Sequence, residues 1–166
     1  MKQALLRVPA LVWLVLFTAC ASLPASDTEE FTGKVIRVHD GDTLTLLKSK
    51  RKHLQIRLEG IDAPEIGQPF GDESRVALDG MVYGRQVTIR PVTIDKYGRT
   101  IARVFLGTLD VNLEMVRLGF AWRYDHYSQE QALGLAQQQA RGQKWGLWQD
   151  RNPTPPWDWR HSHPLK

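Results

Sequence analysis

The sequence contains a single cysteine, Cys20, and only five histidines, which are scattered. One thiol cannot form a disulfide within its own chain, so the fold must be stable without such cross-links. The scarcity of cysteine and the scattering of the histidines also leave no pattern typical of a zinc site. Internal repeats and extended disordered stretches are lacking too. At 166 residues, 42% hydrophobic and 24% charged, the chain has the length and composition of one ordinary globular domain.

A hydrophobic run long enough to span a membrane is also missing. The N-terminal apolar run "VPALVWLVLFTA" (8–19) is too short for a membrane-spanning helix. Lys2 and Arg7 precede it and Cys20 follows it, which is the layout of an export signal peptide. We therefore leave residues 1–19 out of the fold and expect the protein to work outside the cytoplasm.

Two cleavage sites fit this N-terminal segment. The stretch "FTAC" resembles a bacterial lipobox, in which Cys20 would be lipidated, become the mature N-terminus and anchor the protein to a membrane. Alternatively, "ACA" fits the A-x-A pattern of an ordinary export signal, with cleavage before Ser22. The first hypothesis predicts a lipoprotein of the cell envelope, and the second predicts a periplasmic or secreted protein.

A large excess of positive charge is lacking as well. Removing Lys2 and Arg7 with the signal leaves 20 of the 22 basic residues against 18 acidic ones, so the formal net charge falls from +4 to +2. Such a small bulk charge is weak evidence for a nucleic-acid partner. Any argument for such a partner has to rest on where the charges lie.

Five segments have the composition and alternation of β-strands. They follow a small, polar and acidic tether (20–30) and lie at 31–38, 43–47, 53–58, 86–91 and 100–106. Helices are expected at about 71–84, at about 111–118 and from Ser128 onward. At that third helix "SQEQ" has the form of a capping box, and Leu133, Ala136 and Ala140 are expected to face inward.

The tail 151–166 is rich in tryptophan and proline. It is too rich in proline for a helix, and we expect it to pack on the domain of residues 31–150. Five strands with about three α-helices predict an α+β fold, namely a five-stranded OB-fold β-barrel with helical cover.

Three segments at predicted strand ends concentrate the charged residues: "HDGDT" (39–43), "RLEGIDAPE" (57–65) and "DKYGR" (95–99). A barrel can bring all three to one rim. Asp40 and Asp62 are hard oxygen ligands of the kind that hold Ca²⁺ or Mg²⁺, and a cation between them would relieve their repulsion. Glu65 follows the restricted Pro64 and suits a general base that activates a water molecule near the metal.

Arg57 and Arg99 are the complementary half of this set. A guanidinium fork binds phosphate oxygens through two parallel bonds and stabilises the charge that develops in phosphoryl transfer. Taken singly, "DGD" is only a tight turn, and each arginine has an acidic neighbour, Glu59 or Asp95, with which to pair. The combination instead indicates a phosphoryl-transfer site. Glu59 has no role in that site and is expected to orient Arg57 or to meet solvent.

In these segments the chain resembles the staphylococcal nuclease-like, or thermonuclease, family. The resemblance covers about residues 31–160 and is carried, in the family order, by "VIRVHDGDTLTL", "IRLEGIDAPE", "GQPFGDESR", "DKYGRTIARVF", "VNLEMVRLGFAW", "GLW" and "PPWDWR". It implies an OB-fold barrel and a Ca²⁺-dependent phosphodiesterase that cuts DNA and RNA and leaves 3′-phosphate ends. We expect the protein to be a monomer.

The resemblance also implies a role for each matching residue. Asp40 and Asp62 correspond to the calcium carboxylates, and the backbone carbonyl of Ala63 to a further ligand. Ala63 stands where the best-known members have threonine, but only its backbone oxygen is needed. Glu65 corresponds to the general base, and Arg57 and Arg99 correspond to the two catalytic arginines. Lys96 and Tyr97 correspond to the residues near the terminal phosphate of the nucleotide.

Some features depart from the family pattern. The loop after Glu65 lacks the lysine-rich excursion of the best-known members, which affects the grip on substrate. Tyr124 and Tyr127 are both candidates for a second tyrosine that stacks on a nucleotide. Two other functions stay open, a non-catalytic binding module of OB fold and a structural envelope lipoprotein whose tail contacts membrane or wall. Retention of the whole catalytic set favours the nuclease.

Overall fold

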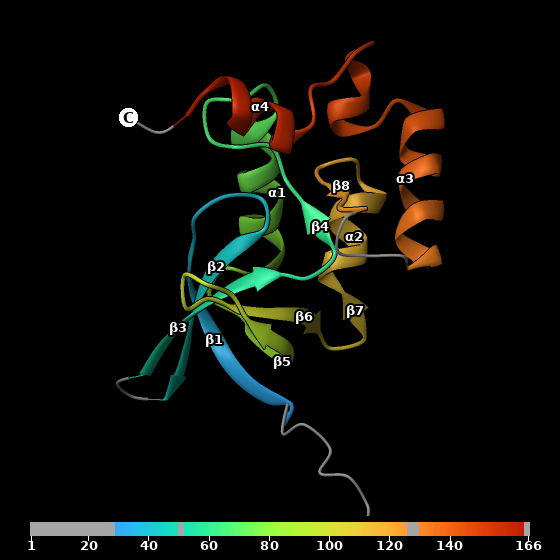
Figure 1. Cartoon of the computed structure of the whole chain (residues 1–166). Coiled ribbons are helices and arrows are strands. Elements are labelled where there is room, and N and C mark those ends of the chain that lie inside the picture. The colour runs from blue at the N-terminus through green and yellow to red at the C-terminus, as the bar shows by residue number, and fades with distance from the viewer. Residues whose placement is uncertain (1–28, 50–51, 126–129, 165–166) are drawn as a thin grey trace, which may run out of the picture.

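The computed structural model describes residues 29–49, 52–125 and 130–164. Its centre is a β-barrel (Figure 1). Five strands form it: β1 (Phe31–Val38), β2 (Thr43–Ser49), β3 (Lys52–Leu58), β5 (Gln86–Ile94) and β6 (Thr100–Leu106). The order β3-β2-β1-β5-β6 is antiparallel throughout, and a parallel pairing of β3 with β6 closes the circle. The predicted five-stranded barrel is confirmed.

The period-two alternation of β3 explains both the core and one wall of the site. Ile56 and Leu58 are buried and join the barrel core with residues such as Leu44 and Ile89. Each fully buried side chain of this size stabilises the fold by about 1.5–3 kcal/mol. Arg57, between them, must point to the opposite face. The strand thus anchors an arginine on a rigid element.

Short elements place the loop that follows β3. β4 (Ile61–Asp62) pairs with β8 (Trp122–Arg123), which holds Asp62 opposite Trp122. β7 (Leu109–Asp110) leads into α2 (Val111–Arg117), which Asp110 caps by accepting a bond from the Leu113 amide at 3.1 Å. Asn112, buried in α2, donates its side-chain amide to the carbonyl oxygens of Glu59 and Ala102. The helix and the end of β3 are therefore fixed to each other.

The other predicted helices are present with shifted ends. α1 is Gly71–Val82 and α3 is Gln131–Gln143, with Leu133, Ala136 and Ala140 buried as expected. α3 has Glu130 as its N-cap, with no side-chain capping bond, and the Glu130 carboxylate instead binds Arg103. Ser128 and the start of the predicted capping box lie outside the described residues.

The expectation that the proline-rich tail contains no helix was wrong. The tail contains α4 (Pro156–Ser162), which follows a 3₁₀-helix, η1 (Gly146–Gln149), at the end of the preceding domain. Pro156 occupies the first turn of α4, where a missing N–H leaves no hydrogen bond unmade and the fixed φ suits a helix. The described chain thus has four α-helices instead of about three.

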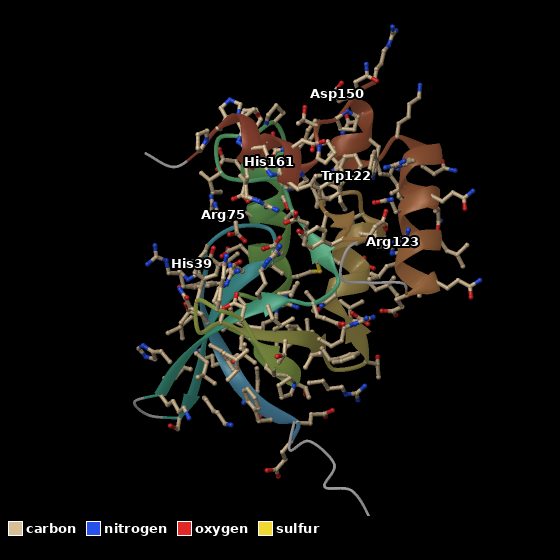
Figure 2. All side chains as sticks on the ribbon, viewed as in Figure 1. His39, Arg75, Trp122, Arg123, Asp150 and His161 are labelled. Carbon is tan, nitrogen blue, oxygen red and sulfur yellow. The ribbon has the colours of Figure 1, made fainter. Side chains whose placement is uncertain are left out.

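The described part of the tail packs on the domain through a second apolar cluster. Trp122, Ala140, Leu147 and Trp148 form its buried centre, and Trp157 of α4 packs against it. Trp122 lies between α3 and α4 (Figure 2), with Arg141 of α3 over its ring at 5.0 Å and Trp157 edge-on at 5.6 Å. α4 is thereby held above the barrel, close to the loop that leads into α1 (Figure 1).

The predicted signal peptide, Cys20 and all of the tether except Glu29 and Glu30 lie outside the described residues. Within the described ranges no helix has the length and apolar character needed to cross a membrane.

Candidate active site

The turn between β1 and β2 lies directly against α1 and the end of β4. A Cβ atom on Gly41 would be 1.8 Å from Ser74 Oγ and 2.7 Å from Ala63 Cβ, so only glycine fits there. The close approach buries Asp42, which is 4% exposed. Its Oδ2 atom accepts a hydrogen bond from the Ala63 amide at 2.7 Å. The turn and the Asp62–Ala63 segment therefore form one unit.

Arg57 joins two buried carboxylates. Its Nη2 atom donates to Asp62 Oδ1 at 2.7 Å, and its Nη1 atom forms an ion pair with Asp42. Asp62 is fully buried. Burial lowers the pKa of Arg57. The negative charges of Asp62 and Asp40 act in the opposite direction, and the positive charge of Arg99 lowers the pKa further. Arg57 and Arg99 also line the same cleft.

Asp40, the predicted ligand in this turn, lies at the edge of the unit. Its Oδ1 atom accepts a hydrogen bond from the Asp42 amide at 3.0 Å, so part of its role is to shape the turn. Burial raises the pKa of Asp40, although the nearby Arg57 acts in the opposite direction. The acid of "DGD" that contacts both Arg57 and the Ala63 amide is Asp42, which the sequence analysis did not single out.

A buried glutamine positions Glu65. The Gln68 side chain accepts a bond from the Glu65 amide at 3.0 Å, and the Gln68 amide donates to the Glu65 carbonyl at 2.9 Å. Gln68 Nε2 also donates to the carbonyl of Thr154 at 2.7 Å. The backbone of Glu65 is therefore fixed, and its loop is tied to the C-terminal tail.

An arginine from the tail completes the cluster, and sequence reasoning missed it. Arg160 of α4 donates to both oxygens of Asp62, from Nη1 at 3.1 Å and from Nη2 at 2.7 Å. Its Nη1 atom also donates to Glu65 Oε1 at 2.6 Å. Hydrogen bonds to Asp62, and then to Glu65, raise the pKa of Arg160 against the effect of burial. The only signal in the sequence was the stretch "PPWDWR", which does not show where its arginine points.

The "DKYGR" turn holds the second predicted arginine. Arg99 Nε donates to Asp95 Oδ2 at 2.7 Å, and the amides of Tyr97 and Arg99 donate to Asp95 Oδ1, both at 2.9 Å. These bonds lower the pKa of Asp95 against the effect of its desolvation. Tyr97 is 70% exposed, with Lys96 Nζ 5.0 Å from its ring centre. The turn therefore presents two cations and an open aromatic ring.

One cleft of about 670 Å³ collects the cationic and aromatic groups, whereas Glu65 lines a neighbouring hollow that shares Arg160 with it. The lining of the cleft includes the three arginines and the exposed residues of the turn, namely Arg57, Arg99, Arg160, Lys96 and Tyr97. Tyr124 also lines it and stacks on Trp157, with ring centres 5.6 Å apart and planes at 11°. Tyr127, the other candidate, lies outside the described residues. Glu59 lines the cleft too, and its carboxylate lies 3.9 Å from Nη1 of Arg103.

Comparison with known proteins decides the family. A family model described as staphylococcal nuclease homologue matches residues 55–150, which is more than half of the chain and includes most of the site. The chain belongs to the staphylococcal nuclease family. The resemblance carried by the sequence motifs is thereby confirmed.

Relatives of this staphylococcal nuclease family member are similar over most of their length. A Haemophilus influenzae protein named as an uncharacterized endonuclease is 40% identical over 152 residues, covering 92% of this chain and 84% of the relative. An Escherichia coli protein of the same name is 45% identical over 130 residues, covering 78% and 84%. A Shigella flexneri protein named micrococcal nuclease is 34% identical over 173 residues, covering 98% and 97%.

The donor set of this family member fits a hard cation with oxygen ligands. Within the described ranges no group of three or more His, Cys, Asp and Glu side chains could hold a metal by itself. A cation here would therefore take the carboxylates of Asp42 and Asp62, the carbonyl of Ala63 and water, an all-oxygen set that suits Ca²⁺. Two guanidinium groups already pair with Asp62, which shows that its carboxylate attracts positive charge at this place.

Proposed function

We propose that this protein is a calcium-dependent nuclease that hydrolyses phosphodiester bonds of DNA and RNA and leaves 3′-phosphate ends. The observation that carries the proposal is the buried unit of Arg57, Asp42 and Asp62. Arg99 lines the same cleft as Arg57, and Arg160 joins Glu65 to Asp62. Membership of the staphylococcal nuclease family and the nuclease names of the relatives support it.

The carboxylates would hold the cation. We assign Asp42 and Asp62 as the calcium carboxylates, with the Ala63 carbonyl as a third ligand and Asp40 shaping the turn behind them. Asp40 remains the alternative ligand that the sequence predicts. A bound calcium ion would supply positive charge beside the attacking water and the scissile phosphate.

The other residues act on the water and the phosphate. Glu65 accepts a proton from the water, whose oxygen forms the new bond to phosphorus. Arg57 and Arg99 bind the phosphate oxygens and stabilise the added negative charge, an effect worth about 3–4 kcal/mol for each well-placed donor. The bond from phosphorus to the 5′ oxygen breaks, and that oxygen takes up a proton. The products are a 3′-phosphate and a 5′-hydroxyl.

Residues along the cleft would bind the rest of the substrate. Lys96 lies beside the terminal phosphate in this assignment, and the exposed ring of Tyr97 offers a face to a base. Tyr124, the one tyrosine candidate within the described residues, lines the same cleft. Stacking and phosphate contacts of this kind tolerate any base sequence.

The cellular location stays a proposal that rests on residues 1–28 alone. Export follows from the signal peptide, and the lipobox-like "FTAC" supports a lipid anchor on Cys20, with a freely secreted chain as the alternative. Mass spectrometry of the mature N-terminus distinguishes the two.

A cleavage assay tests the proposed function. Plasmid DNA and a structured RNA are expected to be degraded in calcium, spared in excess chelator and degraded again when calcium is restored. The product ends are expected to accept labelled phosphate from a kinase at their 5′-hydroxyls without prior phosphatase treatment. Glu65→Gln should lower turnover by about 100-fold or more, because proton transfer by a positioned base contributes about 10²–10⁴-fold.

Glu73→Gln is the matched control, since Glu73 is exposed on α1 and away from the cleft. It should cleave at the wild-type rate. Calcium-independent binding of DNA or RNA without cleavage would contradict the proposal and support the non-catalytic binding module.

A further inference from the structure

The C-terminal helix α4 is fixed to the active site from two sides. Trp157 stacks on Tyr124 of the cleft and lies edge-on to Trp122, while Pro156 is buried. On the other side, the carbonyl of Thr154 accepts the Gln68 side chain that also holds the Glu65 backbone. Arg160 is thus presented to the cleft by a docked helix and not by a loose end of the chain.

Arg160 approaches the carboxylates from the open side of the cleft. Its side chain is 40% exposed, whereas the Asp62 side chain that it contacts is 1% exposed and the Arg57 side chain behind it is 13% exposed. It lines the same cleft as Arg57 and Arg99. Its guanidinium group therefore lies between the open cleft and the buried carboxylate of Asp62.

A divalent cation bound to this cluster would change its balance of charge. Without one, the positive charge of Arg160 compensates Asp62 and Glu65. A divalent cation on Asp62 and the guanidinium group on the same carboxylate would repel each other, so the two compete. A phosphate between them removes the conflict, because its oxygens can bind both the cation and the guanidinium fork.

We propose that Arg160 is a third phosphate-binding arginine of the active site, delivered by the C-terminal helix. Asp62 and Glu65 hold its guanidinium group in place until a cation and a phosphodiester enter, and it then pairs with the phosphate. The inference rests on the proposed function. In this role Arg160 competes with calcium for Asp62 in the free protein. When phosphate is bound, Arg160 and calcium bind that phosphate together.

Calcium binding with and without a phosphate ligand tests this role. The probe is a nucleoside 3′,5′-bisphosphate, which carries phosphates but no phosphodiester bond to cleave, and the readout is titration calorimetry on the full chain. In Arg160→Ala, calcium alone should bind more tightly than in the wild type. At saturating calcium, the affinity for the bisphosphate should fall by about 10- to 100-fold, the loss expected for a hydrogen-bonded charged group.

The coupling between the two ligands gives the sharper readout. In the wild type the bisphosphate should tighten calcium binding by about 5- to 150-fold, and Arg160→Ala should reduce that factor severalfold. Arg160→Lys keeps the charge without the fork and should lie between the two. His161→Ala, an exposed neighbour on the same helix, is the control and should match the wild type.

The outcomes separate the two proposals. If the wild type binds calcium and cleaves DNA but Arg160→Ala and Arg160→Lys keep the wild-type bisphosphate affinity and coupling, the role of Arg160 is overturned. The same holds if Arg160→Ala only tightens calcium binding, because Arg160 would then be a competitor alone. If Arg160→Ala fails to fold, the bisphosphate affinity and coupling of Arg160→Lys, compared with those of His161→Ala, decide the role of Arg160. A wild type that neither binds calcium nor cleaves would overturn the proposed function itself.

Discussion

At the scale of single residues, the site depends on buried carboxylates that share guanidinium groups. Burying an ionised carboxylate is costly unless it is paired and hydrogen-bonded. Asp62 meets this condition through Arg57 and Arg160, and Asp42 meets it through Arg57 and the Ala63 amide. Arg57 therefore stabilises the fold as well as the phosphate. Its replacement by alanine would leave two buried acids short of a partner, a loss of about 3–5 kcal/mol in stability.

The two acids of "DGD" can be distinguished by isosteric amides. Asp42→Asn removes the charge that faces Arg57 and the proposed cation, so we expect calcium affinity to drop and turnover at fixed calcium to fall by about 100-fold or more. Asp40→Asn keeps an oxygen that can accept the Asp42 amide, so turnover should stay within about tenfold of the wild type. Calcium titrations of the cleavage rate, with folding checked by circular dichroism, measure both. The reverse order of the two losses would make Asp40 the ligand.

At the scale of elements, the β1–β2 turn is held in place by its contact with α1. Gly41→Ala would push a methyl group into Ser74 Oγ and Ala63 Cβ. We expect a loss of about 1–3 kcal/mol in the free energy of unfolding, together with weaker calcium binding because Asp42 moves with the turn.

Gly80→Ala is the matched control for this prediction. Gly80 lies within α1, and a Cβ there would meet nothing within 4 Å. Alanine is the better helix former, so this change should stabilise the protein by about 0.5–1 kcal/mol. Urea denaturation measures both variants. Equal stability of the two would show that the turn can move away from α1 at no cost.

The elements also show how far the sequence could predict this molecule. Strand alternation placed all five barrel strands and the opposite faces of β3, because the period of two is local. It could not choose between Asp40 and Asp42, since both flank the same glycine and only packing against α1 and Ala63 distinguishes them. It also could not place Arg160, which lies 98 positions from Asp62 and depends on a helix that proline appeared to forbid.

At the scale of the whole molecule, the described residues form two hydrophobic clusters with different roles. The larger one fills the barrel and includes residues of α1, α2 and α3. The smaller one surrounds Trp122 and Trp148, and α4 reaches it through Trp157. Because α4 contributes nothing to the barrel core, the tail is an attached part that supplies the active site with Arg160.

Shortening the chain after Thr154 tests this division. The variant keeps the Gln68 bond to Thr154 but loses α4, Trp157 and Arg160. We expect a folded barrel with a cooperative urea transition and a loss of about 1–3 kcal/mol in stability, since each aromatic pair contributes about 0.5–1.5 kcal/mol beyond its buried area. The full-length Trp159→Ala is the control, because the Trp159 ring stacks on His163 at 3.8 Å within the tail itself. A shortened chain that fails to fold, beside a stable Trp159→Ala, would show that α4 belongs to the barrel's own folding unit.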